Sequence, residues 1–139
     1  MRGTLLLVMG LCVGSVAFGQ AQALKDLTGA YTVKDFERDG TAVPEKVKDD
    51  ITAFTIKDGK LSITMGKTEL SATLKVDTGK TPAEMDLFPL NADFDKGRKF
   101  PGLFKWEKDT LTILYVEDGE RPKDFTGGKG ITKLVLVKK

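Results

Sequence analysis

The 139-residue chain has no histidine and a single cysteine, Cys12. Without histidine it can form neither a Ser-His-Asp triad nor an imidazole switch that titrates near neutral pH. Cys12 lies in a segment that we predict is removed, so the mature protein would also lack a thiol. That excludes disulfides, thiol nucleophiles and Cys/His zinc sites. Any catalysis would depend on carboxylates, lysine, tyrosine or serine.

The chain also lacks a strong excess of charge of one sign. It has 22 basic and 20 acidic residues, and removing Arg2 with the leader leaves 21 basic against 20 acidic. This balance argues against nucleic acid and against an anionic membrane surface, because both require a sustained basic patch. The partners that we predict are a small-molecule ligand or an envelope protein, and the protein itself is predicted to be a monomer.

The first 23 residues have the pattern of a secretory signal peptide. Arg2 precedes an apolar run from Leu5 to Phe18, and small residues follow it. The run, about 14 residues, is shorter than the roughly 18 to 20 that a membrane-spanning helix needs. Cleavage after Gly19 and cleavage after Ala23 both fit the rule of small residues. We therefore predict a periplasmic or extracellular protein, with no membrane span after cleavage and with residues 24–139 as one domain.

Beyond the leader, short apolar runs alternate with Gly, Asp, Asn and Pro at the spacing of an all-β protein. The clearest alternation places Leu70, Ala72, Leu74 and Val76 on one face of a strand. One short helical turn is predicted from Pro44 to Asp50, since proline suits the first position of a helix. The eight predicted strands are Gly29 to Arg38, Ile51 to Lys57, Lys60 to Met65, Thr68 to Asp77, Glu84 to Phe88, Gly102 to Glu107, Thr110 to Glu117 and Ile131 to Lys138.

The lengths of the connections predict how these strands are arranged. Asp58-Gly59 is a strong signal for a two-residue hairpin turn. If each strand is antiparallel to the one before it, the three long connections (39–50, 89–101 and 118–130) all lie at the same end. One tightly turned end and one loop-rich end are typical of an eight-stranded antiparallel up-and-down barrel, whose interior is filled by side chains or holds one small ligand. Closure also removes exposed sheet edges.

Between residues 27 and 138 a series of short motifs occurs in a fixed order: Leu27-x-Gly29-x-Tyr31, Gly40-x-x-Val43-Pro44, Pro82-x-x-Met85-Asp86-Leu87, Gly102-Leu103-Phe104, Asp109-x-Leu111, Gly119-Glu120-Arg121-Pro122-x-x-Phe125 and Leu134-Val135-Leu136. On these motifs the chain resembles an uncharacterised secreted family, abundant in planctomycete bacteria and described as lipocalin-like. The resemblance implies a lipocalin-like (calycin-type) barrel and carries no established activity.

Lipocalins carry a tryptophan early in the first strand, packed near the closed end against an arginine of the last strand. Here Tyr31 takes the place of that tryptophan, and the last strand ends in Lys138-Lys139, which puts such a seal in doubt. Arg121 could substitute for the arginine, but its connection belongs to the opposite end. We predict that Tyr31 and Arg121 do not touch.

The candidate ligand-binding residues are Phe94, Arg98, Arg121 and Phe125, all on the long connections of the loop-rich end. Arginine recognises carboxylates in a forked geometry, so these residues would suit a small anionic or amphipathic molecule. For the barrel as a whole we predict binding of a small apolar or amphipathic ligand at its loop-rich end. In the alternative interpretation, Arg121 bonds loop carbonyls or a neighbouring carboxylate, and Phe125 caps the core. The protein would then be a non-catalytic envelope interaction or structural module with a filled barrel.

No metal, cofactor or catalytic residue is predicted. The stretch Asn91-x-Asp93-x-Asp95-x-Gly97 resembles the start of a calcium loop, but its glycine is one position late and Gly102 stands where a bidentate glutamate is needed. The paired carboxylates Asp49-Asp50 and Glu117-Asp118 lie in turns, where solvent would leave them without the desolvation that tunes a general acid. The sequence therefore predicts a protein that is not an enzyme.

Overall fold

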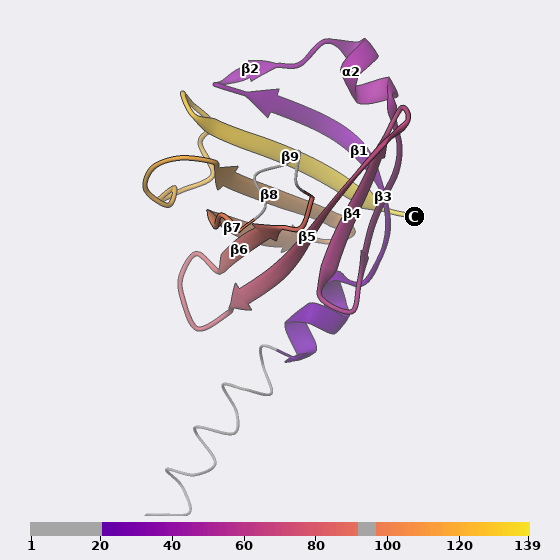
Figure 1. Ribbon diagram of the computed structural model, residues 1–139. Coiled ribbons are helices and arrows are strands. Elements are labelled where there is room, and N and C mark those ends of the chain that lie inside the picture. Colours follow the sequence, from indigo (N-terminus) through magenta and orange to yellow (C-terminus); the bar gives the residue numbers. More distant parts are fainter. Residues whose placement is uncertain (1–20, 92–96) are drawn as a thin grey trace, which may run out of the picture.

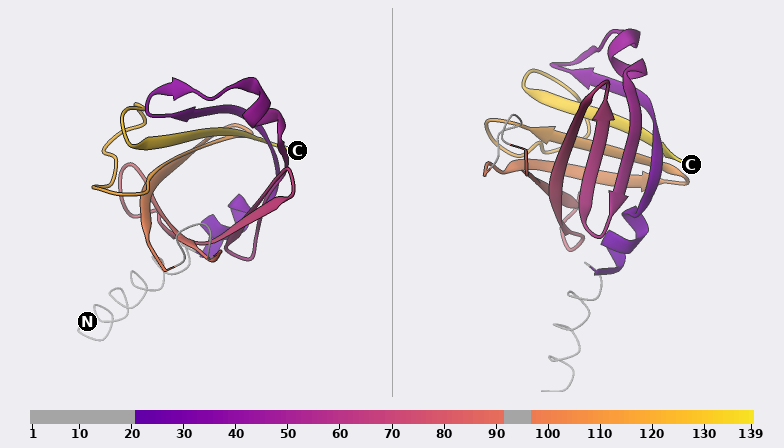
Figure 2. Two further views of the ribbon diagram at one scale, coloured as in Figure 1. Left: turned by 45° about the horizontal axis from the view of Figure 1, so that its top comes forward. Right: turned by 45° about the vertical axis from the view of Figure 1, so that its right-hand side comes forward.

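The computed structural model describes residues 21–91 and 97–139. Their strands form one antiparallel sheet in the order β2-β1-β3-β4-β5-β6-β7-β8-β9, and β1 also pairs with β9 (Figure 1; Figure 2, left). All strands except β2 thus close into an eight-stranded barrel, which confirms the predicted fold class. The strands are β1 (Gly29–Arg38), β2 (Thr41–Ala42), β3 (Ile51–Lys57), β4 (Lys60–Met65), β5 (Thr68–Asp77), β6 (Glu84–Pro89), β7 (Phe100–Glu107), β8 (Thr110–Val116) and β9 (Ile131–Lys138).

Five of the barrel strands have the predicted bounds, because alternation and turn residues are local signals. Strand β7 is the main difference, since it starts at Phe100 and includes Pro101. The prediction began this strand at Gly102, as proline cannot donate a hydrogen bond within a sheet. Pro101 is tolerated because β7 pairs with β8 only from Gly102 onward. Residue 101 therefore does not need a backbone N–H to donate a hydrogen bond to β8.

Two elements were not predicted. The short strand β2 folds back on the end of β1, pairing Ala42 with Glu37. Residues 21–27 are helical, and this segment packs Ala23 and Leu27 onto the barrel core. The predicted turn at Pro44 is confirmed as α2 (Glu45–Asp49), for which Pro44 is the N-cap residue.

The long connections lie at one end of the barrel, as predicted from their parity. We call this the open end; it carries residues 39–50, 90–91, 97–99 and 117–130. The opposite, closed end carries the turns 58–59, 78–83 and 108–109. Asp58 and Gly59 both have positive φ, 53° and 74°, which is the backbone of the predicted hairpin turn. The helical residues 21–27 lie at the closed end (Figure 1).

A lysine of the last strand packs against the aromatic side chains at the closed end. Tyr31 is buried; its hydroxyl donates to the Leu27 carbonyl, and its ring centroid lies 6.2 Å from that of Trp106. The Lys138 ammonium lies 5.6 Å from the Trp106 ring centroid and donates to the Asp26 carbonyl at 3.1 Å. Lys138 therefore connects β9 to the Trp106 indole and to the helical residues 21–27. Arg121 takes no part in these contacts, because its guanidinium binds the Gly102 carbonyl and the Asp86 carboxylate.

Side chains fill the half of the barrel next to the closed end. The strands alternate, so one face of each points inward, and the inward residues there are almost fully buried. The largest of them are Leu27, Tyr31, Ile56, Leu61, Leu74, Val76, Met85, Phe104, Leu111 and Leu136. This half supplies much of the buried apolar surface of the barrel, and the cavity described below lies in the open half.

Candidate ligand cavity at the open end

A cavity of about 560 Å³ occupies the open half of the barrel. Strands β1, β3, β4, β5, β8 and β9 contribute to its wall, together with residues from the 39–50 connection. Ten of the thirteen lining residues have apolar side chains, so the cavity suits an apolar molecule better than a polar one. The lining residues are Phe36, Arg38, Val43, Pro44, Val47, Ile51, Phe54, Ile63, Met65, Leu70, Tyr115, Glu117 and Leu134.

The connection that carries α2 covers one side of this cavity. Val43, Pro44 and Val47 line it from this connection. Strands β1 and β3 pair only at Gly29 and Ala30, so they separate toward the open end. The Lys48 ammonium of α2 donates to the Lys34 carbonyl of β1 at 3.2 Å, which ties the helix across this separation. The helix therefore closes the cavity where the sheet itself does not.

Charged groups are confined to the rim. Arg38 and Glu117 form an ion pair at 3.8 Å with both side chains substantially exposed, a geometry that contributes little to stability. Arg98 donates to the Glu117 carbonyl and lies 3.9 Å from the Asp118 carboxylate. This arrangement of an apolar chamber below a charged rim matches a molecule with an apolar body and a polar head.

Tyr115 contributes an uncharged polar side chain to the cavity wall. It is buried on β8, and its ring stacks on that of Phe100 at 5.7 Å. Burial raises the pKa of Tyr115 to about 12, and the neighbouring Glu117 carboxylate acts in the same direction. The phenol is therefore neutral at physiological pH, so it can hydrogen-bond a ligand without adding charge to the chamber.

The predicted site residues do not come together at this cavity. Arg98 lies at the rim beside Glu117, whereas Arg121 and Phe125 lie on the outer wall of the barrel. Phe94 lies outside the described residues. The cavity lining could have been predicted from the sequence. Strand alternation identifies the inward residues, and the connection lengths identify the open end, so together they select positions such as Ile63 and Leu70.

Arg121 is held on the outer wall by three contacts. Its Nη1 donates to the Gly102 carbonyl at 2.9 Å, its Nη2 lies 2.7 Å from Asp86 Oδ1, and its Nε lies 3.6 Å from Glu84 Oε1. The Asp86 contact is an ion pair that does not meet hydrogen-bond geometry. These contacts match the alternative interpretation of Arg121, in which it bonds a carbonyl and a neighbouring carboxylate.

The 117–130 connection follows the outer wall because apolar residues there need cover. Leu103, Leu114 and Val116 point outward by strand alternation, yet they are at most 6% exposed. Pro122 of the connection is buried as well. Phe125 does not cap the barrel core, since its ring lies outside, 4.7 Å from the Lys105 ammonium.

The fold and the cavity define a class: a small closed antiparallel β-barrel that is filled at one end and hollow at the other. No family model, no curated protein and no solved structure matches the chain. The resemblance to the secreted lipocalin-like family therefore stays a prediction.

The described residues also bear on two other kinds of site, a membrane span and a metal site. Within residues 21–91 and 97–139, no helix is both long and apolar enough to cross a membrane. The same residues contain no cluster of three or more carboxylate, cysteine or histidine side chains arranged to hold a metal ion. The stretch that resembles a calcium loop includes Asp93 and Asp95, which lie outside the described residues.

Proposed function

We propose that the protein is an exported, non-enzymatic carrier that binds one small apolar or amphipathic molecule in the open-end cavity. The observation that carries the proposal is the cavity of about 560 Å³ with its apolar wall. Its volume lies within the roughly 300 to 1,000 Å³ typical of small-molecule sites. The alternative of a structural module with a filled barrel has less support, because only the closed half of the barrel is filled.

The distribution of polar groups suggests how the ligand is oriented. The apolar body would lie against residues such as Phe54 and Leu134, where burial contributes about 25 cal/mol per Å² of apolar surface. A polar head would lie at the rim, where Arg38 is only weakly held by Glu117 and is free to exchange that partner for a ligand carboxylate or hydroxyl. Tyr115 supplies a neutral hydrogen-bonding group on the same side.

Export rests on the leader sequence, and the fold favours one of its two cleavage positions. Ala23 and Leu27 belong to the core cluster, and the partly buried Leu24 packs against it. Cleavage after Gly19 would leave this helical segment intact, whereas cleavage after Ala23 would remove one of its contacts. We expect a mature chain that begins at Gln20, which N-terminal sequencing of the exported protein would establish; a chain beginning at Leu24 would contradict this.

Filling the cavity should abolish binding without unfolding the barrel. Leu70 and Thr73 lie on the same strand, β5, but Leu70 lines the cavity and Thr73 is exposed on the outer face. We expect Leu70→Trp to lose any molecule retained by the natively purified protein, as seen by native mass spectrometry. It should also weaken binding of the amphipathic probe anilinonaphthalene sulfonate by about tenfold or more.

Thr73→Trp is the matched control and should bind the probe as the unmodified protein does. Thermal unfolding of both variants shows whether the barrel is intact. If Leu70→Trp binds the probe as tightly as Thr73→Trp does, the cavity is not the binding site and the proposal fails.

A further inference from the structure

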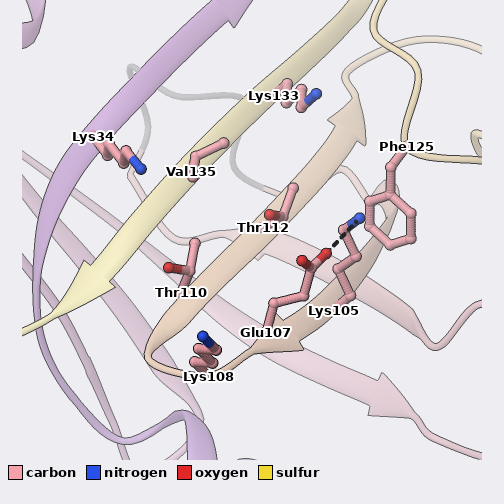
Figure 3. Close-up of a pocket in the computed structure, with 9 residues that line it drawn as sticks. All are labelled: Lys34, Lys105, Glu107, Lys108, Thr110, Thr112, Phe125, Lys133 and Val135. Carbon is pink, nitrogen blue, oxygen red and sulfur yellow. Dashed lines mark ion pairs between the residues drawn. The ribbon is translucent and has the colours of Figure 1, made fainter.

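The outer wall of the barrel carries a second recess, which the carrier function does not use. It has a volume of about 510 Å³ and lies across β7, β8, β9 and β1, with Phe125 of the 117–130 connection at one side (Figure 3). We call it the outer groove. Its lining residues are Lys34, Lys105, Glu107, Lys108, Thr110, Thr112, Phe125, Lys133 and Val135.

Strand register explains why these residues meet. Lys105 of β7 faces Thr112 of β8, and Thr112 faces Val135 of β9, so the three form one row across the wall. Lys34 joins the row from β1, where the pairing with β9 shifts between Val33 and Asp35. A bulge of this kind adds one residue to a strand and redirects its side chain. Four strands thus position most of the groove, and Lys108 of the β7–β8 turn and Phe125 of the 117–130 connection complete it.

The charge of the groove differs from that of the whole protein. Four lysines line it with one carboxylate, Glu107, although the complete chain carries only +2. Glu107 is already paired with Lys105 at 2.9 Å. Among the described residues, no ion pair joins Lys34, Lys108 or Lys133 to a carboxylate. The nearest acidic positions by register are Asp35 and Glu37 on β1, together with Asp109 in the turn. Within the lining itself the lysines outnumber the carboxylate by four to one, which favours an anion over a cation.

The floor of the groove narrows the chemistry of that anion. Thr110 and Thr112 lie between the lysines, and Val135 is the only aliphatic lining residue (Figure 3). The Thr110 hydroxyl donates to the Asp109 carboxylate at 3.4 Å, and Thr112 is 7% exposed, so a ligand hydroxyl would reach Thr110 more readily than Thr112. This surface is too polar for an apolar ligand or for the apolar face of a protein helix. A peptide strand has no sheet edge to join at the centre of the groove, because β8 pairs with both β7 and β9 along its length, and β9 pairs with both β8 and β1. The Lys105 ammonium lies over the Phe125 ring, which argues against base stacking.

We propose that the outer groove binds an acidic oligosaccharide, a chain that offers hydroxyl groups together with carboxylate or sulfate groups. The lysines would pair with the acidic groups, and the threonine hydroxyls would exchange hydrogen bonds with the sugar hydroxyls. This site is separate from the cavity, which lies inside the barrel at its open end. Its occupancy does not depend on the proposed carrier function.

The test measures binding of three probes by isothermal titration calorimetry: an oligogalacturonate, a heparin-derived oligosaccharide and a neutral maltooligosaccharide. The protein should bind at least one of the two acidic probes and not the neutral one, and added salt should weaken the binding. Which acidic probe binds distinguishes a carboxylate from a sulfate ligand. The proposal is overturned if neither acidic probe binds, or if the neutral probe binds equally well.

Two sets of variants separate a built site from general charge attraction. Lys34→Gln with Lys133→Gln should weaken binding of the acidic probe by about tenfold. The matched control is Lys57→Gln with Lys75→Gln, which removes the same charge from exposed positions on β3 and β5 and should leave binding unchanged. Equal weakening by both pairs would show non-specific attraction and would reject the groove as the site.

Thr112→Val tests the role of the hydroxyl floor with a side chain of the same shape. It should weaken binding of the acidic oligosaccharide several-fold. The affinity of the groove for inorganic phosphate, measured by its competition with the oligosaccharide, should be unchanged. If phosphate displaces the oligosaccharide at equal concentration and Thr112→Val has no effect, the groove is a simple anion site and the saccharide assignment is wrong.

Discussion

Gly102→Ala is expected to destabilise the barrel by about 3 kcal/mol or more, the upper range for overpacking a core. A Cβ at this position would lie 2.1 Å from the Leu114 carbonyl oxygen and 3.0 Å from the Tyr115 Cβ. Both neighbours belong to β8, whose backbone is held by β7 on one side and β9 on the other. Relief would require the two strands to separate, so the expected cost is large for the addition of one methyl group.

Urea denaturation of the two proteins measures this loss. Gly128→Ala is a suitable control, because a Cβ at Gly128 would meet no atom within 4 Å. That variant should stay within about 1 kcal/mol of the unmodified protein. A loss below about 1 kcal/mol for Gly102→Ala would mean that β7 and β8 can move apart, and the close approach would then have no structural importance.

Arg121→Met is expected to cost about 2 kcal/mol of unfolding free energy. The change removes the cation that separates Glu84 from Asp86 and leaves the Gly102 carbonyl without its arginine donor. The side chains of Arg121, Glu84 and Asp86 are at most 30% exposed, so water would replace the lost contacts only in part. We also expect faster hydrogen exchange in the 117–130 connection, because Arg121 attaches it to β6 and β7.

The triple variant Arg121→Met, Glu84→Gln and Asp86→Asn should recover most of the lost stability, since it removes the repelling carboxylates as well. This result would show that Arg121 acts by neutralising its neighbours. The opposite pattern, in which Arg121→Met leaves stability unchanged and abolishes probe binding, would instead support the sequence-based assignment of Arg121 to ligand binding.

Much of the fold could be predicted because its signals are local. The alternation around Leu70 to Val76 indicates which side chains point inward, and Asp58-Gly59 specifies a hairpin. The parity of the connection lengths then assigns the open end without any knowledge of contacts. The candidate site was harder to predict. Loop residues were chosen for their chemistry, whereas the cavity wall is built mainly from ordinary aliphatic residues such as Ile63 and Leu134.

The charged stretch from Asp118 to Phe125 shows the same limit. Its composition predicts an ordered loop at the open end, and it does leave β8 there. Nothing local indicates that it then returns along the outer wall. That path depends on Leu103, Leu114 and Val116, which face outward on β7 and β8 and need cover from water. Arg121 follows the path and meets Glu84 and Asp86, far from it in sequence.

The sequence by itself determined the number, order and direction of the barrel strands and the end at which each connection lies. These properties follow from the alternation of apolar and polar residues along each strand and from the turn residues between strands, and both signals extend over only a few positions. Only the tertiary structure decided that the barrel is filled at one end and hollow at the other, and that four lysines meet on its outer wall. The cavity volume depends on the combined size of side chains from six strands. The lysine groove depends on the register in which four strands pair. Neither quantity is encoded in any single segment of the chain.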